Sequence, residues 1–185
     1  MVGAFLTQQT TWESVEKVLN ELKRRDLMSV GAIVRLPLED LESMLRPAGF
    51  YRQKARNIRA LAVYLEKNYA SDPGGLLSKD LFEARKELLS LPGIGNETAD
   101  VILLFAGSRP KFVAAVYVSR VLKRLDIFDS DDYLEVQRFM ESKVLPGPRR
   151  YAHLYALLVH HARTTCRSRP RCEACFLRGE CEFTG

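Results

Sequence analysis

The residues whose type and spacing most clearly suggest chemistry are four cysteines near the C-terminus. They form the pattern C-x5-C-x2-C-x5-C, and no other cysteine occurs in the chain: Cys166, Cys172, Cys175 and Cys181. A short segment that offers four thiolates can bind a metal ion or an iron–sulfur cluster. Structural zinc sites usually combine two C-x2-C pairs. This segment has one pair with wider spacing on both sides, so the pattern favours a [4Fe–4S] cluster over zinc.

Two disulfides are the alternative use of these cysteines. A chain of 185 residues can bury a core without such cross-links. The sequence shows no signal peptide that would direct it to an oxidising compartment. It also contains no run of 18 apolar residues, so we expect no contact with a membrane. We therefore expect reduced thiols and an intracellular protein of the cytoplasm or nucleoid.

The charge of the chain is modestly basic, with a formal net charge of +5. Its position is more informative than its sum, because six arginines gather late in the sequence: Arg149, Arg150, Arg163, Arg167, Arg169 and Arg171. Such a group is either solvated surface or a rim that faces nucleic acid. The helix expected near residues 81–90 contains only two basic residues, Arg85 and Lys86, which we interpret as a solvated helix face.

Apolar residues recur at helical spacing along the whole chain, which predicts an all-α protein. Helices are expected after Thr11, around 41–45 and at 53–69, 81–90, 96–106, 113–125, 131–143 and 149–164. Trp12 is expected in the core. Residues 1–6 are apolar from the first position, as in the middle of a buried helix, and this favours a further segment N-terminal to them.

A proline and two glycines interrupt the helical pattern in the sequence Leu91-Pro92-Gly93-Ile94-Gly95. Pro92 would end the first helix, Gly93 and Gly95 would permit positive φ, and Leu91 and Ile94 would anchor the loop in the core. The next helix then begins with backbone N–H groups that can bind an anion such as a DNA phosphate. A plain turn between two helices is the alternative.

The hairpin, the helix 96–104 and the cysteine segment together closely resemble the endonuclease III superfamily of helix–hairpin–helix DNA glycosylases. The segments 45–49 and 50–55 and the sequence His161-Ala162-Arg163 resemble further motifs of that family. The resemblance covers nearly the whole chain and implies a [4Fe–4S] cluster on the four cysteines. It also implies a base-excision enzyme that flips a damaged or mispaired base out of double-stranded DNA.

The fold that the resemblance implies has two helical lobes, a helix–hairpin–helix motif and a C-terminal iron–sulfur loop. Residues 1–20 with 126–185 would form one lobe, and residues 21–125 the helical-barrel lobe with the hairpin at 91–95. Gln9 would fill the space left by the flipped base, and Phe50 would wedge into the opposite strand. Phosphate contacts would come from the stretch that contains Arg167, Arg169 and Arg171. We expect a monomer.

Two positions depart from the bifunctional family pattern, and the first is Glu97. Bifunctional members carry a lysine there, which forms a Schiff base with the sugar. A carboxylate cannot form an imine, so Glu97 implies a monofunctional enzyme. The helix sequence resembles most closely the branch that excises alkylated purines, and next the mismatch thymine and uracil glycosylases.

The second departure is Ala115. Family members carry an aspartate there, typically in the sequence Phe-Val-Val-Asp-Ala-Tyr, and it stabilises the oxocarbenium-like sugar. In this chain residues 112–117 read Phe-Val-Ala-Ala-Val-Tyr, so the enzyme is expected to be inactive or weakened. An engineered aspartate-to-alanine change is favoured over a natural binding protein, because the rest of the motif is retained. Tyr117 is a candidate residue of the base pocket.

Three hypotheses remain open from the sequence: a monofunctional glycosylase, a non-catalytic module that binds DNA lesions, and a regulatory or electron-transfer protein that contains a cluster. Steep salt dependence of DNA binding would exclude the third. Restoring an aspartate at Ala115 would distinguish the first two, since only a glycosylase would regain excision.

Overall fold

The structure, a computed structural model, describes residues 1–183, and these residues form eleven α-helices and no strand. The all-α prediction is therefore confirmed. The chain divides into two compact units, Met1–Ile102 and Leu103–Gly185. Among residues 1–183, no helix is long and apolar enough to cross a bilayer. The lobe boundaries inferred from the sequence stay a prediction.

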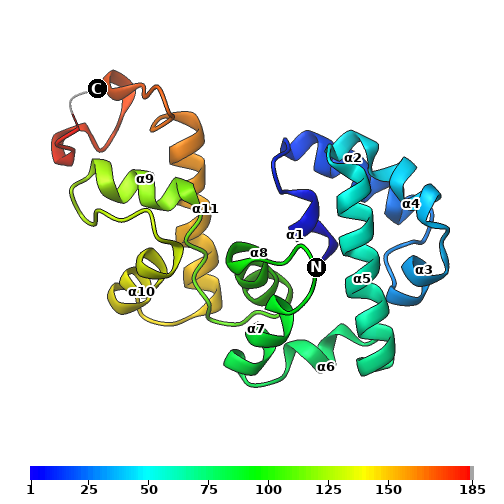
Figure 1. Cartoon of the computed structure of the whole chain (residues 1–185). Helices are drawn as coiled ribbons and strands as arrows, with labels where there is room; N and C mark the ends of the chain where they lie inside the picture. Colours follow the sequence, from blue (N-terminus) through cyan, green and yellow to red (C-terminus); the bar gives the residue numbers. More distant parts are fainter. Residues whose placement is uncertain (184–185) are drawn as a thin grey trace. The chain divides into compact units, whose positions relative to one another are not determined.

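The first unit is built around one long central helix. Its elements are α1 (Val2–Leu6), α2 (Trp12–Arg24), α3 (Val30–Arg35), α4 (Leu38–Leu45), the 3₁₀ turn η1 (Arg46–Ala48), α5 (Tyr51–Tyr69), α6 (Pro73–Leu77), α7 (Leu81–Leu89) and α8 (Asn96–Val101). Helix α5 packs against α1, α3, α4 and α6, as Figure 1 shows. Its buried stripe contains Ile58, Leu61 and Leu65 at helical spacing, so burial of that stripe holds the unit together.

A polar cluster joins α5 to α7 at the partly exposed end of the long helix. Glu87 accepts hydrogen bonds from the hydroxyls of Tyr64 and Tyr69, the latter at 2.6 Å. Lys79 Nζ binds the other oxygen of the same carboxylate at 2.9 Å. Burial works against ionisation of Glu87, but the three donors lower the pKa of its carboxyl to about 2. The cluster thus contributes stability through an ionised carboxylate.

The second unit begins in a π-helical turn, η2 (Ile102–Ala106), which continues directly from α8. Its other elements are α9 (Val116–Arg124), α10 (Tyr133–Lys143), α11 (Pro148–Thr164) and the 3₁₀ turns η3 (Cys172–Ala174) and η4 (Arg178–Glu180). Helices α9 and α11 pack side by side. Phe112 lies edge-on to Tyr151, with ring centroids 5.5 Å apart, in a core where both side chains are fully buried.

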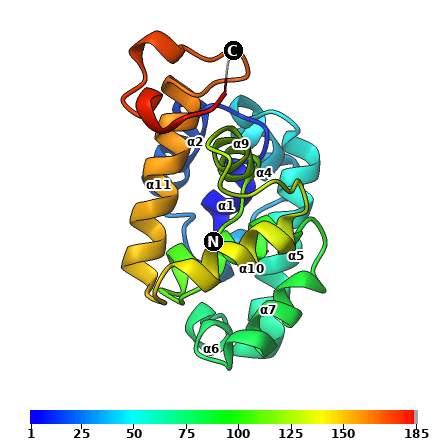
Figure 2. The same ribbon diagram turned by 90° about the vertical axis from the view of Figure 1, so that its left-hand side faces the viewer.

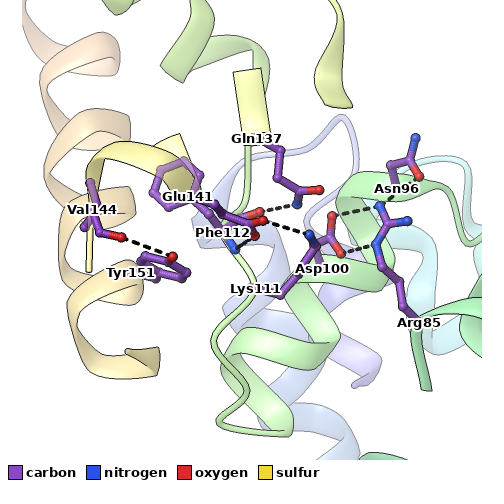
Figure 3. A network of polar contacts seen from close by, with 9 residues as sticks. All are labelled: Arg85, Asn96, Asp100, Lys111, Phe112, Gln137, Glu141, Val144 and Tyr151. Atoms are coloured by element: carbon purple, nitrogen blue, oxygen red, sulfur yellow. Dashed lines mark hydrogen bonds and ion pairs between the residues drawn. The ribbon is translucent and has the colours of Figure 1, made fainter. Parts of the chain in front are cut away.

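The prediction of a helix over 113–125 is wrong at its beginning, because α9 starts only at Val116. Residues 112–115, directly before it, are buried and not helical, and two side chains of α10 bind the backbone of Phe112. Glu141 accepts a hydrogen bond of 3.0 Å from the Phe112 N–H, and Gln137 donates to the Phe112 carbonyl. Lys111 also forms a 3.0 Å ion pair with Glu141 (Figure 3). These bonds tie the chain just before residues 113–115 to α10.

Candidate DNA-binding and catalytic site

The hairpin 91–95 joins α7 to α8 and shows why a glycine is needed at one position. Gly93 has φ +74, a left-handed conformation that disfavours other residues. A Cβ atom there would lie 1.7 Å from Nδ2 of the buried Asn57. Gly95 differs from the prediction, because its φ is −92 and a Cβ there would meet nothing within 4 Å. Only Gly93 therefore uses the left-handed conformation that was expected of both glycines.

The end of the hairpin presents the start of α8 without a side-chain cap. Gly95 is the N-cap residue and has no side chain to accept from the first-turn N–H groups. Ile94 is buried and anchors the loop, whereas Leu91 is half-buried. A helix start of this kind suits an anion such as a phosphate.

The interpretation of Arg85 as a solvated residue is wrong. Its guanidinium lies across the two hairpin helices and binds Asp100 through two bonds, Nε to Oδ1 at 2.8 Å and Nη2 to Oδ2 at 3.1 Å (Figure 3). Nη2 also donates to Asn96 Oδ1 at 2.9 Å. The Asp100 side chain is fully buried. The pair fixes α7 against α8, and the sequence did not reveal it because Asp100 falls inside an apolar helix.

Gln9 lies in an exposed turn that the neighbouring Gln8 ties to the hairpin. Gln8 Nε2 donates to the Gly93 carbonyl at 3.3 Å and to Thr98 Oγ1 at 2.8 Å. Gln9 itself is exposed and has φ +50. The structure therefore brings the Gln9 turn and the hairpin together, although more than 80 residues separate them in the sequence.

Phe50 is also an exposed residue with a left-handed backbone. It is 68% exposed, has φ +46 and lies directly before α5. It is therefore not an ordinary core aromatic. Trp12 is 59% exposed, which contradicts the expectation that it lies in the core. The reason is its position at the start of α2, just after the capping residue Thr11, where it lies off the buried stripe of Val15, Val18 and Leu22.

Ala115 is the last residue of the non-helical segment 112–115 and the N-cap residue of α9. It is 1% exposed, with φ −58 and ψ 157. Val118 donates its N–H to the Ala115 carbonyl at 2.8 Å, so the helix begins immediately after this position. The Tyr117 ring lies below Arg120, 5.4 Å from the guanidinium carbon. A residue at position 115 is thus held at a helix start, where a carboxylate would be stabilised.

Glu97 is in the first turn of α8, in the first unit, whereas Ala115 belongs to the second unit. Burial raises the pKa of the Glu97 carboxyl above its ordinary value. Glu97 as a whole residue is nonetheless exposed to solvent, and its side chain has no amine with which to attack a sugar.

All four cysteines line one pocket of the second unit and none forms a disulfide. The pocket is otherwise lined mainly by apolar side chains such as Val121, Leu125 and Leu177. Within residues 1–183, no three histidine, cysteine or acidic side chains converge on a point that could hold one metal ion. Figure 2 shows the loop beyond the C-terminal end of α11. Four thiols around a largely apolar pocket are a donor set that fits a [4Fe–4S] cluster.

Two arginines of α9, which belong to no motif recognised in the sequence, hold this loop. Arg124 donates Nη1 to Cys166 Sγ at 3.3 Å and to the Arg167 carbonyl at 2.6 Å, and Nη2 to the Ser168 carbonyl at 3.1 Å. Arg120 donates to the carbonyls of Cys166 and Ala162. In the sequence, the only indication of this arrangement is that Arg120 and Arg124 are four residues apart and therefore lie on the same face of one helix.

The arginines predicted to contact phosphate are placed on the surface of the loop. Arg167, Arg169 and Arg171 are all exposed. His161 is buried below them, with Nε2 3.9 Å from Cys175 Sγ and its ring edge-on to Phe176. Arg171 also lines the cysteine pocket, so the loop presents exposed positive charge directly beside the thiols.

A model of the "HhH-GPD superfamily base excision DNA repair protein" family matches residues 2–146. A relative from Methanocaldococcus jannaschii, named "Putative DNA repair glycosylase MJ1434", is 35% identical over 98% of this chain and 83% of its own length. The chain belongs to the HhH-GPD superfamily and is a base-excision DNA repair glycosylase of the endonuclease III type.

Solved structures agree with this assignment. The "Structure of a non-covalent Endonuclease III-DNA Complex" matches with a TM-score of 0.83 and 30% identity, over 98% of this chain and 80% of that one. The 3-methyladenine DNA glycosylase MagIII of H. pylori, bound to 1,N6-ethenoadenine, matches with a TM-score of 0.76 and 27% identity over 88% of this chain and 82% of that one.

Proposed function

We propose that this chain is a monofunctional DNA glycosylase scaffold whose hydrolytic step is weakened or absent. The observation that carries the proposal is the pair of positions Glu97 and Ala115. Glu97 supplies no amine for a Schiff base, which removes the lyase chemistry. Ala115 supplies no carboxylate to stabilise the positive charge that develops on the sugar when the glycosidic bond breaks.

The substrate class that we propose is double-stranded DNA with a damaged or mispaired base, and alkylated purines are the first bases to test. The helix after the hairpin resembles the alkylpurine branch, and the similarity to a 3-methyladenine glycosylase supports this choice. Exposed Gln9 and Phe50 would occupy the duplex when the base leaves it. The uncapped start of α8 and the exposed arginines of the cysteine loop would bind phosphates.

The cysteines would hold a [4Fe–4S] cluster, and its role would be to cross-link the loop that carries the arginines. The common pocket, its apolar lining and the Arg124 N–H bond to Cys166 support this. Purified protein should contain about four irons per chain together with acid-labile sulfide. Zinc without sulfide would overturn the cluster and leave the glycosylase proposal intact.

The decisive experiment is the variant Ala115→Asp. It should excise a base from at least one duplex in a panel of alkylated, deaminated, oxidised and mismatched substrates, and leave an intact abasic site. The control is Val116→Asp, which adds the same charge one residue further on, where the side chain is 65% exposed. This control should not excise.

Borohydride trapping separates the two departures. Neither the parent chain nor Ala115→Asp should be trapped on DNA, because neither forms an imine at position 97. Adding Glu97→Lys to Ala115→Asp should produce a trapped adduct. Trapping of the parent chain would refute the monofunctional assignment.

The second candidate is a binding module that recognises a lesion without excising it. The buried Ala115 itself favours it, because a methyl group at the helix start leaves no acid or base there. The same panel decides between the two: if Ala115→Asp binds a lesion tightly but excises nothing, the binding module is correct.

A further inference from the structure

Lys54 is a buried lysine whose ammonium group is saturated by three backbone carbonyls. It lies near the start of α5 and is 2% exposed. Its Nζ donates to the carbonyl of Leu6 at 3.1 Å, of Gln8 at 2.8 Å and of Ala48 at 2.7 Å. An ammonium group has three N–H donors, so each donor has one carbonyl.

The three carbonyls come from two segments that are far apart in the sequence. Leu6 and Gln8 lead into Gln9, whereas Ala48 lies two residues before Phe50. Both Gln9 and Phe50 have left-handed backbones, with φ +50 and +46, and both are exposed. Such conformations persist in residues other than glycine only where the surroundings fix the neighbouring backbone. Lys54 fixes the backbone next to both.

This arrangement exceeds what packing alone requires. Burial lowers the pKa of Lys54, so the protein accepts an energetic cost to keep an ammonium group there. The apolar stripe of α5 continues directly from this position through Ile58 and Leu61. An aliphatic side chain could fill the site, but it would leave three carbonyls without a donor and would separate the two segments.

We propose that Lys54 is a positioning residue that sets the spacing between the Gln9 turn and the Phe50 turn, so that both side chains enter the duplex together. The inference rests on the proposed function, because it concerns how the exposed Gln9 and Phe50 side chains act on DNA. Gln8 extends the same coupling to the hairpin through its bond to Gly93. The Gln9 and Phe50 side chains therefore enter the duplex as one unit, because Lys54 binds the backbone beside both.

The test measures base unstacking with 2-aminopurine placed next to the lesion in a duplex. With the parent chain, binding should raise the fluorescence of the unstacked base. Lys54→Met should lower the equilibrium constant for unstacking, obtained from this increase, about tenfold, a change of about 1.4 kcal/mol. The affinity for undamaged duplex, measured by anisotropy, should change less than about twofold, because phosphate contacts supply most non-specific binding.

The matched control is Lys67→Met, which removes the same charge from an exposed position of the same helix. It should leave unstacking at the parent level. A second measurement excludes a merely structural effect. In a background of Gln9→Ala and Phe50→Ala, adding Lys54→Met should cause no further loss, since coupled residues are not additive.

Circular dichroism first establishes that Lys54→Met is folded. If it is not, Lys54→Arg takes its place, because a planar guanidinium keeps the charge but cannot direct three donors at the same three carbonyls. Parent-level unstacking in the folded variant, or full additivity with the Gln9 and Phe50 changes, overturns the role of Lys54 alone. A parent chain that binds DNA without unstacking any base overturns the proposed function, and this role with it.

Discussion

Removal of Arg85 should destabilise the hairpin more than removal of its partner Asp100. The two residues share bonds of 2.8 and 3.1 Å between α7 and α8. The carboxylate is fully buried, whereas the Arg85 side chain is 17% exposed. Arg85→Met leaves a buried negative charge without its cation, which costs about 3–5 kcal/mol. Asp100→Asn leaves a cation that reaches solvent and still binds Asn96, so its cost should be about 1–3 kcal/mol.

The assay is urea denaturation followed by far-UV circular dichroism, and the control is Lys86→Met. Lys86 is the next residue on the same helix and is exposed, so its replacement should change the free energy of unfolding by less than about 0.5 kcal/mol. Thermal melting should show the same order, with about 2–4 °C lost for each kcal/mol in a chain of this size. The reasoning fails if Arg85→Met is as stable as Lys86→Met, or if Asp100→Asn is the more harmful change.

Three further predictions concern the hairpin, the polar cluster and the cysteine loop. Gly93→Ala should weaken DNA binding and lower the free energy of unfolding by at least about 1–3 kcal/mol, because the new methyl group meets Asn57 at a left-handed position. Gel shifts and urea denaturation measure the two effects, and a fully stable variant would contradict the steric reasoning. The pKa of Glu87 is lowered to about 2, so the stability that its carboxylate contributes is present above about pH 4.5 and lost as the pH falls toward 2. In urea titrations, Glu87→Gln should reduce this loss of stability at acid pH by up to about 3 kcal/mol. An unchanged loss would exclude the cluster as its source. Arg124→Met should speed loss of iron to a chelator severalfold by freeing the loop at Cys166, and equal release rates would show that the arginine does not retain it.

Much of the fold followed from helical periodicity, because long amphipathic helices such as α2 and α5 are determined mainly by the residues they bury. The beginning of α9 did not. Residues 113–115 are apolar in a pattern that suits a helix, but they are not helical, and side chains of α10 bind the adjacent backbone at Phe112. That competition involves residues 25 or more positions away, and local sequence cannot express it.

The candidate site divides in the same way. The spacing of the cysteines predicted a common pocket, and the structure places all four around one. Arg85 was expected on a solvated helix face, and no role was assigned to Lys54, but both are largely buried through partners elsewhere in the chain. A signal for Lys54 existed, because it lies in register with Ile58, Leu61 and Leu65 on the apolar stripe of α5. A lysine in such a register indicates a buried polar partner.

The left-handed residues Gln9 and Phe50 have a consequence for any effort to improve this protein. Each conformation costs about 1 kcal/mol or more in a residue that is not glycine. A glycine would relax the backbone at either position, so a screen for thermostability alone would tend to select such changes. In the proposed function those two side chains occupy the opened duplex. Substitutions that raise heat resistance at Gln9 and Phe50 would then impair repair. A screen would have to measure DNA binding as well as stability to preserve these two residues.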